Sequence, residues 1–333
     1  LSQDKELVAK RMNDMREAHA VDPSRIMTFT SGWAGSEDKE EDSKAHMLPF
    51  DTTLYRKGWH DNHRAGGPET WVENYYKGPK DNIMYTGNRT EVFLRGEEGA
   101  ISTPPRIQLI NDEVERTGKT GWDGLFWKSQ YKAFTDYFQK KGLASHFGTL
   151  DDLTRSMANV SFEHQGRRSE GMRMQNLGEA YMVNGWEAMP YDNHSGIVDI
   201  YRNPKGDASI LAYYNQPLYV AVASRNQVVK LPGSAIVDFY IVNEKNLKGN
   251  HTLEIKVIAP DGKVVYTRNE TVCFEGGETF GQLLLENVEV PVNGKEGNYR
   301  ILADIKAENQ LICAQEQDEV VAVVWQANDM DGI

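Results

Sequence analysis

The pattern of apolar residues changes once along the chain, near residue 217, and this change most constrains the fold. Before it, short apolar strands such as residues 26–30 and 92–95 alternate with helical segments such as 122–141. This alternation is typical of α/β folds. After it, several short apolar stretches are separated by Asp-Gly, Gly-Gly and Asn-Gly turns, without helices between them. That second pattern predicts a β-sandwich. The sequence therefore predicts two domains, at residues 1–215 and 216–333.

Length and charge agree with two globular domains and a neutral ligand. A chain of 333 residues is long for a single domain. The net charge of −12, from 49 acidic and 37 basic residues, would repel nucleic-acid phosphates and anionic membrane surfaces. We therefore expect no nucleic acid and no membrane as partner. Seven Trp and fifteen Tyr residues provide large rings that fill cores or lie against ligands such as sugars.

The cysteine content, the apolar runs and the first residues argue against disulfide-rich, Cys-x-x-Cys metal-binding and membrane-spanning proteins. Cys273 and Cys313 are too few for a disulfide framework or a paired Cys-x-x-Cys metal site, and whether they pair is open. No apolar run has the length of a membrane span, and the first residues lack the apolar region of a signal peptide. The chain begins without Met and inside a helix predicted at 3–19, which suggests a fragment or a processed product. We expect a periplasmic or secreted protein rather than a cytoplasmic one.

Two adjacent carboxylates form the sharpest motif. Glu97 and Glu98 follow the apolar strand at 92–95 and lie between Gly96 and Gly99. The carboxyl end of a barrel strand is where (β/α)8 enzymes place their catalytic side chains, and glycines allow backbone or ligand to approach closely. A charged surface turn is the other interpretation of this motif.

The motif resembles that of glycoside hydrolase family 2, in which the seventh barrel strand ends in the nucleophile Glu, followed by an aromatic residue, Gly and often Ala. On that register Glu97 is the nucleophile. Glu98 stands at the aromatic position, so it remains the alternative nucleophile. Trp186, the segment 192–199 and Arg202-Asn-Pro-Lys205 are similar to the eighth strand and its exit in the family. The resemblance implies the C-terminal half of a (β/α)8 TIM barrel, followed by an immunoglobulin-like β-sandwich.

Other polar and aromatic residues fit a sugar pocket. The stretch from Trp59 to His63 could bind a sugar through the Trp ring and through hydrogen bonds from its Asp and His, and related enzymes have an Asp and a His after the sixth strand. A structural loop and a metal site that includes His60 are the alternatives; because no third well-spaced ligand follows, we expect no metal. Trp33 is either packing at the rim or a substrate contact. The expected substrate contacts are Trp33, Trp59, Asp61, His63, Trp186, Asp192 and Asn193.

The resemblance implies a β-galactosidase-like or related retaining β-glycosidase that hydrolyses O-glycosidic bonds of oligo- or polysaccharides without a cofactor. Such an enzyme needs a nucleophile and an acid/base carboxylate about 5 to 5.5 Å apart. In the family the acid/base Glu follows an Asn at the end of the fourth strand, which places it before residue 1, so we expect the fragment to be inactive alone. Asn243-Glu244 has the same dipeptide but lies within the β-sandwich pattern, and we reject it.

The alternative function is a non-catalytic carbohydrate-binding or scaffolding protein that uses the β-sandwich. Half a barrel would expose a sheet edge and apolar faces. We therefore predict a homodimer through that surface, or its closure by the N-terminal helix. The sequence does not specify the sugar or the linkage. Aromatic residues at helical spacing are expected to pack between helices: Trp122, Trp127, Tyr131, Phe134, Tyr137 and Phe138.

Overall fold

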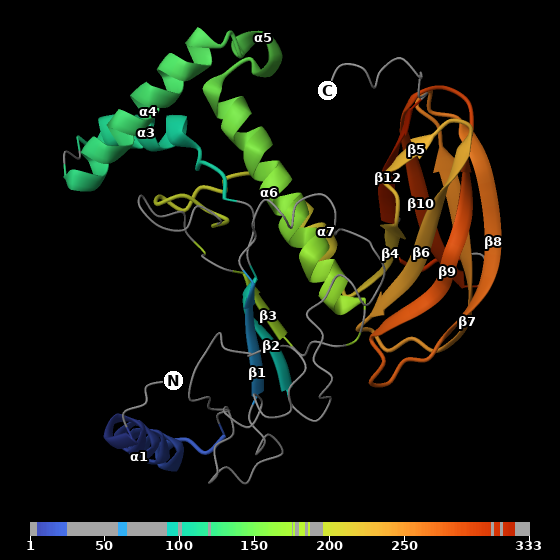
Figure 1. Cartoon of the computed structure of the whole chain (residues 1–333), viewed down its shortest axis with the longest axis horizontal. Coiled ribbons are helices and arrows are strands. Elements are labelled where there is room, and N and C mark those ends of the chain that lie inside the picture. The colour runs from blue at the N-terminus through green and yellow to red at the C-terminus, as the bar shows by residue number, and fades with distance from the viewer. Residues whose placement is uncertain are drawn as a thin grey trace. The chain divides into compact units, whose positions relative to one another are not determined.

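The chain folds into two compact units in the computed structural model (Figure 1). The residues that the structure describes are 5–24, 59–64, 92–98, 102–118, 121–174, 176, 180–183, 186, 196–307, 310–313 and 316–323. Of these, the first unit contains the residues up to Arg168 and those from 180 to Tyr214. The second unit contains residues 169–176 and the described residues from Asn215 onward.

The first unit contains a parallel sheet of three strands in the order β1-β2-β3. These are β1 (Trp59–Arg64), β2 (Val92–Glu98) and β3 (Ala180–Val183). Parallel neighbours need a long crossover, usually a helical one. The chain between β2 and β3 supplies α3 (Ile107–Thr117), α4 (Trp122–Lys140), α5 (Ala144–Phe147) and α6 (Leu150–Arg173). Helix α1 (Lys5–Val21) precedes the sheet and α7 (Ala208–Tyr214) follows it. The predicted alternation of strands and helices is therefore present.

The helices between β2 and β3 pack around their own apolar cluster. Ile107, Ile110 and Val114 of α3 share it with Trp127 and Phe138 of α4. Arg106 joins the starts of α3 and α6, because its guanidinium donates two hydrogen bonds to the Asp151 carboxylate, at 2.9 and 2.6 Å. Tyr131 and Phe134 are partly buried against the cluster, as expected. Tyr137 is 57% exposed, so its predicted packing role is wrong, and the side chain of Trp122 lies outside the described set.

The second unit consists of two sheets that share one core. One sheet has the order β4-β6-β9, formed by β4 (Leu218–Ser224), β6 (Gly233–Asn243) and β9 (Gly281–Val292). The other has the order β5-β12-β10-β7-β8, with β11 (Gln310–Leu311) beside β10. Its strands are β5 (Val228–Lys230), β7 (Gly249–Ile258), β8 (Val264–Phe274), β10 (Gly297–Ala307) and β12 (Glu316–Val323). All neighbouring pairs are antiparallel except β5 with β12.

Alternate residues of facing strands form this core. Val220 and Val237 from the smaller sheet and Ile255 and Ile301 from the larger sheet belong to a single buried cluster. The turn-rich pattern predicted strands without helices between them, and the structure has antiparallel sheets in this part of the chain.

The smaller sheet is buried on both faces, because a second cluster lies on the side away from the shared core. Tyr219 and Tyr240 belong to it together with Met174, which directly follows α6. The neighbouring Arg173 donates to Glu244 at 2.8 Å and to the carbonyl of Gln216 at 2.6 Å. Strands buried on both faces are continuous apolar runs rather than alternating ones, and every residue of β4 is buried.

A tyrosine fixes the connection between the two sheets. The Tyr299 ring of β10 is buried in the core, and its hydroxyl lies 3.0 Å from the carbonyl of Asn293 and 2.9 Å from that of Lys295. A tyrosine near the start of a strand that bonds back to the preceding corner is the tyrosine corner of immunoglobulin-like sandwiches. The hydroxyl of the buried Tyr299 thereby has hydrogen-bond partners in the turn.

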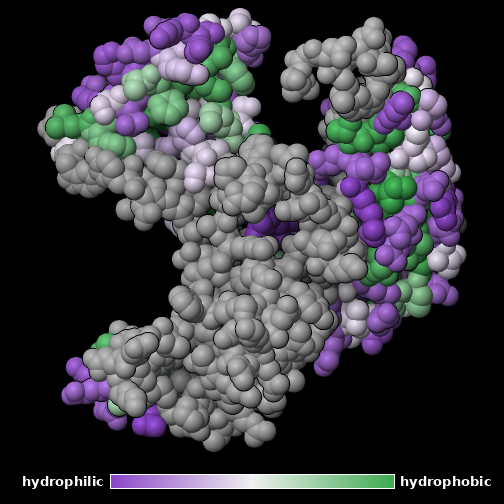
Figure 2. Space-filling view, in the orientation of Figure 1, coloured by the Kyte–Doolittle hydropathy of each residue, from purple (hydrophilic) through white to green (hydrophobic). Residues whose placement is uncertain are grey.

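The outer surface of the second unit mixes hydrophilic and hydrophobic side chains (Figure 2). Among the described residues of this unit, the exposed large apolar ones are Val228, Val264, Val265, Leu283 and Leu311. They belong to β5, β8, β9 and β11, and single apolar residues of this kind are normal on protein surfaces.

Three local expectations differ from the structure. Strand β2 continues to Glu98, so the paired carboxylates lie within the strand and not after it. The stretch from Trp59 to His63, considered as a loop, is strand β1. The helix expected over 150–180 ends at Arg173.

Candidate active site

The carboxyl ends of the three parallel strands define the candidate site. Parallel strands end at the same edge of a sheet, and in barrel enzymes this edge carries the catalytic residues. Glu97 and Glu98 are the last two residues of β2, the central strand. Strand β2 therefore has a neighbouring strand on each side, and Figure 1 labels the three strands of this sheet.

The pairing of β1 with β2 brings several predicted site residues together. His63 is the register partner of Glu97, and Arg64 is the partner of Glu98. Asp61, two residues before His63, pairs with Leu94, and Trp59 pairs with Val92 at the start of both strands. The predicted nucleophile and the predicted contacts of the first strand thus lie on adjacent strands.

Both pairings are irregular next to the carboxylates. The register shifts between Asp61 and His63 on one side of β2, and between Arg95 and Glu98 on the other. Bulges are common beside active sites, where they redirect a side chain, and a Gly within a strand often marks them. Gly96 lies inside the second shift. Gly96 of the Gly-Glu-Glu-Gly motif therefore lies where the regular pairing of β2 with β3 is interrupted.

The remaining predicted contacts are placed less completely. Trp33, Asp192 and Asn193 lie outside the described residues, and His60, Asp61 and His63 are described in their backbone alone. The indole of Trp186 is 61% exposed. Its carbonyl accepts hydrogen bonds from the backbone N–H groups of Ile197 and Val198, both at 3.1 Å.

The segment after Trp186 is shaped by a buried carboxylate. Asp199 is fully buried, and its Oδ1 accepts hydrogen bonds from the N–H groups of Tyr201 at 2.8 Å and Asn203 at 2.9 Å. This closes a tight turn in which Arg202 has a positive φ of 69°. The family motif around these residues therefore builds a turn.

Lys205 links that turn to the segment after β2, a contact that sequence reasoning missed. Its side chain is fully buried, and Nζ donates a 2.9 Å hydrogen bond to the carbonyl of Thr103. Burial lowers the pKa of Lys205 from 10.5 to about 8. A charged residue in the Arg-x-Pro-Lys motif was visible in the sequence, but its burial was not.

We predict a pH-dependent effect of Lys205→Met on stability. Between pH 8 and 10.5 the unfolded chain holds the proton of Lys205 more tightly than the folded chain, so the unfolding free energy rises with pH. Relative to Lys205→Met, the unfolding free energy of the native protein should rise by up to about 3 kcal/mol between pH 8 and pH 10.5. Below pH 8, Lys205 should contribute no pH dependence to this difference. Urea titrations from pH 7 to 10.5 measure the difference. Lys140→Met, at an exposed lysine, is the control; equal slopes for both variants would contradict the prediction.

The dipeptide Asn243-Glu244, rejected as an acid/base motif, has structural contacts. The amide of Asn243 bonds to both the N–H and the carbonyl of Leu247, at 3.0 and 2.8 Å. Glu244 accepts hydrogen bonds from Arg173. Both side chains stabilise the second unit.

The solved structures to which this chain is similar include glycoside hydrolases of family 2, the family that the motifs indicated. A β-D-mannosidase from Dictyoglomus thermophilum is 15% identical with a TM-score of 0.44, over 84% of this chain and 34% of that protein. An exo-chitosanase from Amycolatopsis orientalis is 13% identical with a TM-score of 0.43, over 78% and 30%. A family 2 member from Bacteroides cellulosilyticus is 14% identical with a TM-score of 0.26, over 32% and 14%.

These similarities are partial, since the chain spans about a third or less of each of these proteins. No family model and no curated protein sequence matches the chain. None of the described helices is long and apolar enough to cross a membrane.

Proposed function

We propose that this chain carries the nucleophile half of the active site of a retaining β-glycosidase that hydrolyses O-glycosidic bonds of oligo- or polysaccharides. The observation that carries the proposal is the register of the parallel sheet, in which His63 is paired with Glu97 at the carboxyl ends of β1 and β2. A carboxylate at the carboxyl end of a barrel strand is what a glycosidase nucleophile requires.

In this proposal Glu97 attacks the anomeric carbon. The bond to the leaving oxygen breaks, a covalent glycosyl-enzyme forms, and water then releases the sugar with retained configuration. A second carboxylate must protonate the leaving oxygen and later take a proton from the water. We assign that role to no residue of this chain. If the chain follows the family pattern, the acid/base Glu precedes helix α1. We therefore expect no hydrolysis by residues 1–333 alone.

The neighbouring residues are proposed to hold the first sugar ring. His63 would donate a hydrogen bond to the Glu97 carboxylate and orient it for attack. Trp59 and Asp61 on β1, together with Trp186, Asp192 and Asn193 later in the sequence, would contact the ring and its hydroxyls. Trp33 is kept as a rim contact.

The finer fold assignment belongs to the same proposal. We infer that β1, β2 and β3 are the sixth, seventh and eighth strands of a (β/α)8 barrel. We infer also that the two-sheet unit is an immunoglobulin-like sandwich, supported by the Tyr299 corner and by β5 pairing in parallel with β12. The homodimer, or closure of the half-barrel surface by the N-terminal helix, stays a prediction.

Covalent labelling tests the function directly. The protein that supplies both carboxylates is incubated with a panel of 2-deoxy-2-fluoro glycosides, and the modified residue is located by peptide mass spectrometry. A sugar on Glu97 is the expected result, and the reactive glycoside identifies the sugar preference. A sugar on Glu98 would move the nucleophile by one residue. No label with any glycoside, together with glycan binding by the two-sheet unit, would favour the non-catalytic alternative.

A further inference from the structure

The chain between β2 and α3 is anchored by a buried lysine. Thr103 is the fifth residue after Glu98, at which β2 ends. The carbonyl of Thr103 accepts the 2.9 Å hydrogen bond from Nζ of Lys205, whose side chain is fully buried. Lysine is almost never buried to this extent without a partner, because its charge is costly to remove from water. The hydrogen bond therefore fixes a point within six residues of both candidate carboxylates.

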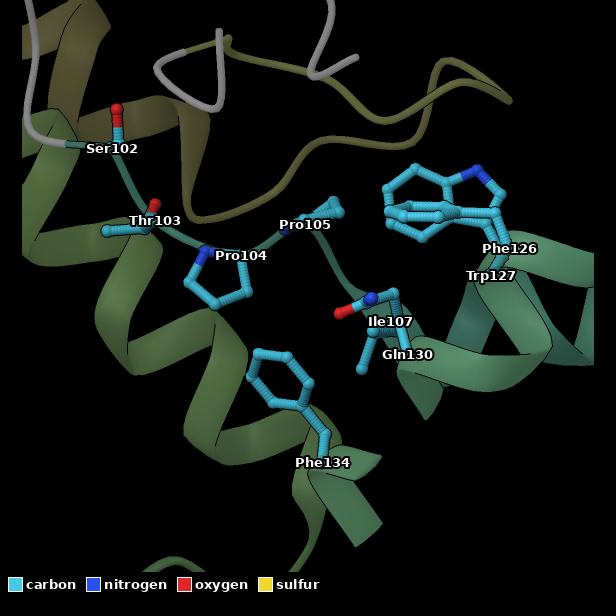
Figure 3. A pocket seen from close by; sticks show the side chains of 9 residues that line it. All are labelled: Ser102, Thr103, Pro104, Pro105, Ile107, Phe126, Trp127, Gln130 and Phe134. Atoms are coloured by element: carbon cyan, nitrogen blue, oxygen red, sulfur yellow. The ribbon is translucent and has the colours of Figure 1, made fainter. Parts of the chain in front are cut away.

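One side of the anchored segment faces a cavity of about 440 Å³. Pro104 and Pro105 line it from the segment, and Phe126 and Phe134 line it from α4. Figure 3 shows Pro104 beside the Phe134 ring. A filled core holds its neighbours in place, whereas a cavity removes those contacts. The packing against α4 therefore leaves the segment room to move, and the bond from the buried lysine opposes that movement.

The pairing of β2 with its neighbours does not by itself hold the end of the strand firmly. Both of its pairings shift register beside Glu97 and Glu98. A shift of this kind interrupts the ladder of main-chain hydrogen bonds. A loop that is fixed at both ends has fewer conformations than one that is fixed at one end. The placement of the two carboxylates therefore depends also on how the residues after them are held.

The same lysine belongs to a turn that holds the backbone of Trp186. The main-chain N–H of Lys205 donates a 3.0 Å hydrogen bond to the carbonyl of Ile197. The N–H groups of Ile197 and Val198 in turn donate to the carbonyl of Trp186, both at 3.1 Å. Trp186 is the third residue after β3. One turn thus joins the segment that follows β2 to the segment that follows β3.

This turn is supported by the helices of the first unit. Ile200 and Tyr201 are partly buried against the apolar cluster of the helices between β2 and β3. Asn159 of α6 accepts a 2.8 Å hydrogen bond from the N–H of Asp207. A Cβ at Gly206 would lie only 2.5 Å from Oδ1 of Asn159, so the backbone approaches α6 closely there. These contacts leave the turn little freedom, and it can therefore serve as a fixed support.

We propose that Lys205 is a positioning residue for the reaction, because it holds the segment after β2, and with it Glu97, in place relative to a sugar ring at Trp186. This inference rests on the proposed function, in which Glu97 attacks the ring that Trp186 contacts. Lys205 itself touches no reacting atom. A displacement of about 1 Å between reacting groups can lower a rate about a hundredfold, even when its cause lies far from the chemistry.

The rate of covalent labelling of Glu97 tests the proposal, in the protein that supplies both carboxylates. A 2-deoxy-2-fluoro glycoside with a dinitrophenyl leaving group needs no acid catalyst, so its labelling rate reports the attack alone. Lys205→Met keeps the length of the side chain but removes the donor. It should label about a hundredfold more slowly at saturating glycoside, with a half-saturating concentration within about twofold of the native value. Lys205→Arg restores a donor and should regain about tenfold of that rate.

Tyr214→Phe is the matched control, because it removes a 2.7 Å hydrogen bond to Glu163 elsewhere in the same unit. It should lower the urea midpoint and yet label as fast as the native protein. Hydrogen–deuterium exchange gives a second measurement that does not depend on activity. Peptides that cover residues 92–107 should exchange about tenfold faster in Lys205→Met, because one hydrogen bond that holds the segment is lost. Peptides of β6 should not change.

The outcomes separate this inference from the proposed function. If no glycoside labels the native protein, the proposed function fails, and the positioning role fails with it even when the exchange of residues 92–107 rises. If Glu97 is labelled equally fast in Lys205→Met and Tyr214→Phe, the positioning role is wrong and the proposed function stands. Slower labelling without faster exchange in residues 92–107 would also overturn the inference, since Lys205 would then not act through this segment.

Discussion

Gly281→Ala should destabilise the second unit by about 3 kcal/mol, the upper end of the usual cost of overpacking. A Cβ at Gly281 would lie 2.0 Å from the carbonyl oxygen of Arg173 and 2.8 Å from both the nitrogen of Asn176 and the carbonyl carbon of Met174. All three are backbone atoms, so no side-chain rotation can relieve the clash. The end of α6 would have to move away from β9. The Asn176 side chain, which accepts a 3.0 Å hydrogen bond from the Phe280 N–H, would move with it.

Gly171→Ala is the matched control for this prediction. Gly171 lies in α6, and a Cβ there would meet no atom within 4 Å. Because alanine favours a helix more than glycine, this change should raise the unfolding free energy by up to about 1 kcal/mol. Urea denaturation followed by circular dichroism measures both variants. Equal midpoints for Gly281→Ala and the native chain would show that α6 does not approach β9 as described.

Glu97→Gln should lower the rate of glycoside hydrolysis about ten-thousandfold or more, measured in the protein that supplies both carboxylates. The reason is that an amide cannot form the covalent glycosyl-enzyme on which the proposed mechanism depends. Loss of the nucleophile should lower kcat and leave binding of the uncleaved substrate nearly unchanged.

Glu98→Gln is the control for Glu97→Gln, since it makes the same chemical change one residue away in the same strand. We expect it to lower the rate far less. The Glu97→Ala variant should also regain turnover with added azide, which can take the place of the carboxylate. A large loss for Glu98→Gln with a small one for Glu97→Gln would assign the nucleophile to Glu98.

The change from alternating strands and helices to antiparallel sheets could be predicted from the sequence because its signals are local. Apolar runs such as residues 235–242, interrupted by Asp238, belong to strands buried on both faces, and Asp-Gly and Asn-Gly turns separate such runs. Strand β9 was missed, because its Pro291 and its acidic residues weaken the strand pattern. The strand lies at the edge of its sheet, where a proline is tolerated.

The site was predictable in its residue types and less so in its geometry. A Gly-Glu-Glu-Gly motif indicates a carboxylate at a strand end, but the pairing of His63 with Glu97 depends on a register that only the fold defines. The contact between Lys205 and Thr103 joins residues 102 positions apart. The cavity beside α4 arises from helix packing, and no spacing of residues in the sequence indicates it.

The second unit is discontinuous in the chain, because residues 169–176 belong to it while the residues between 180 and Tyr214 do not. Arg173 and Met174 cover one face of its smaller sheet, through the Gln216 carbonyl and the ring of Tyr219. A gene segment cut once before Asn215 would therefore encode the two sheets with that face uncovered. Recombination could not move this two-sheet unit intact as an independent cassette, and we expect it to have been inherited together with the helix that precedes β3.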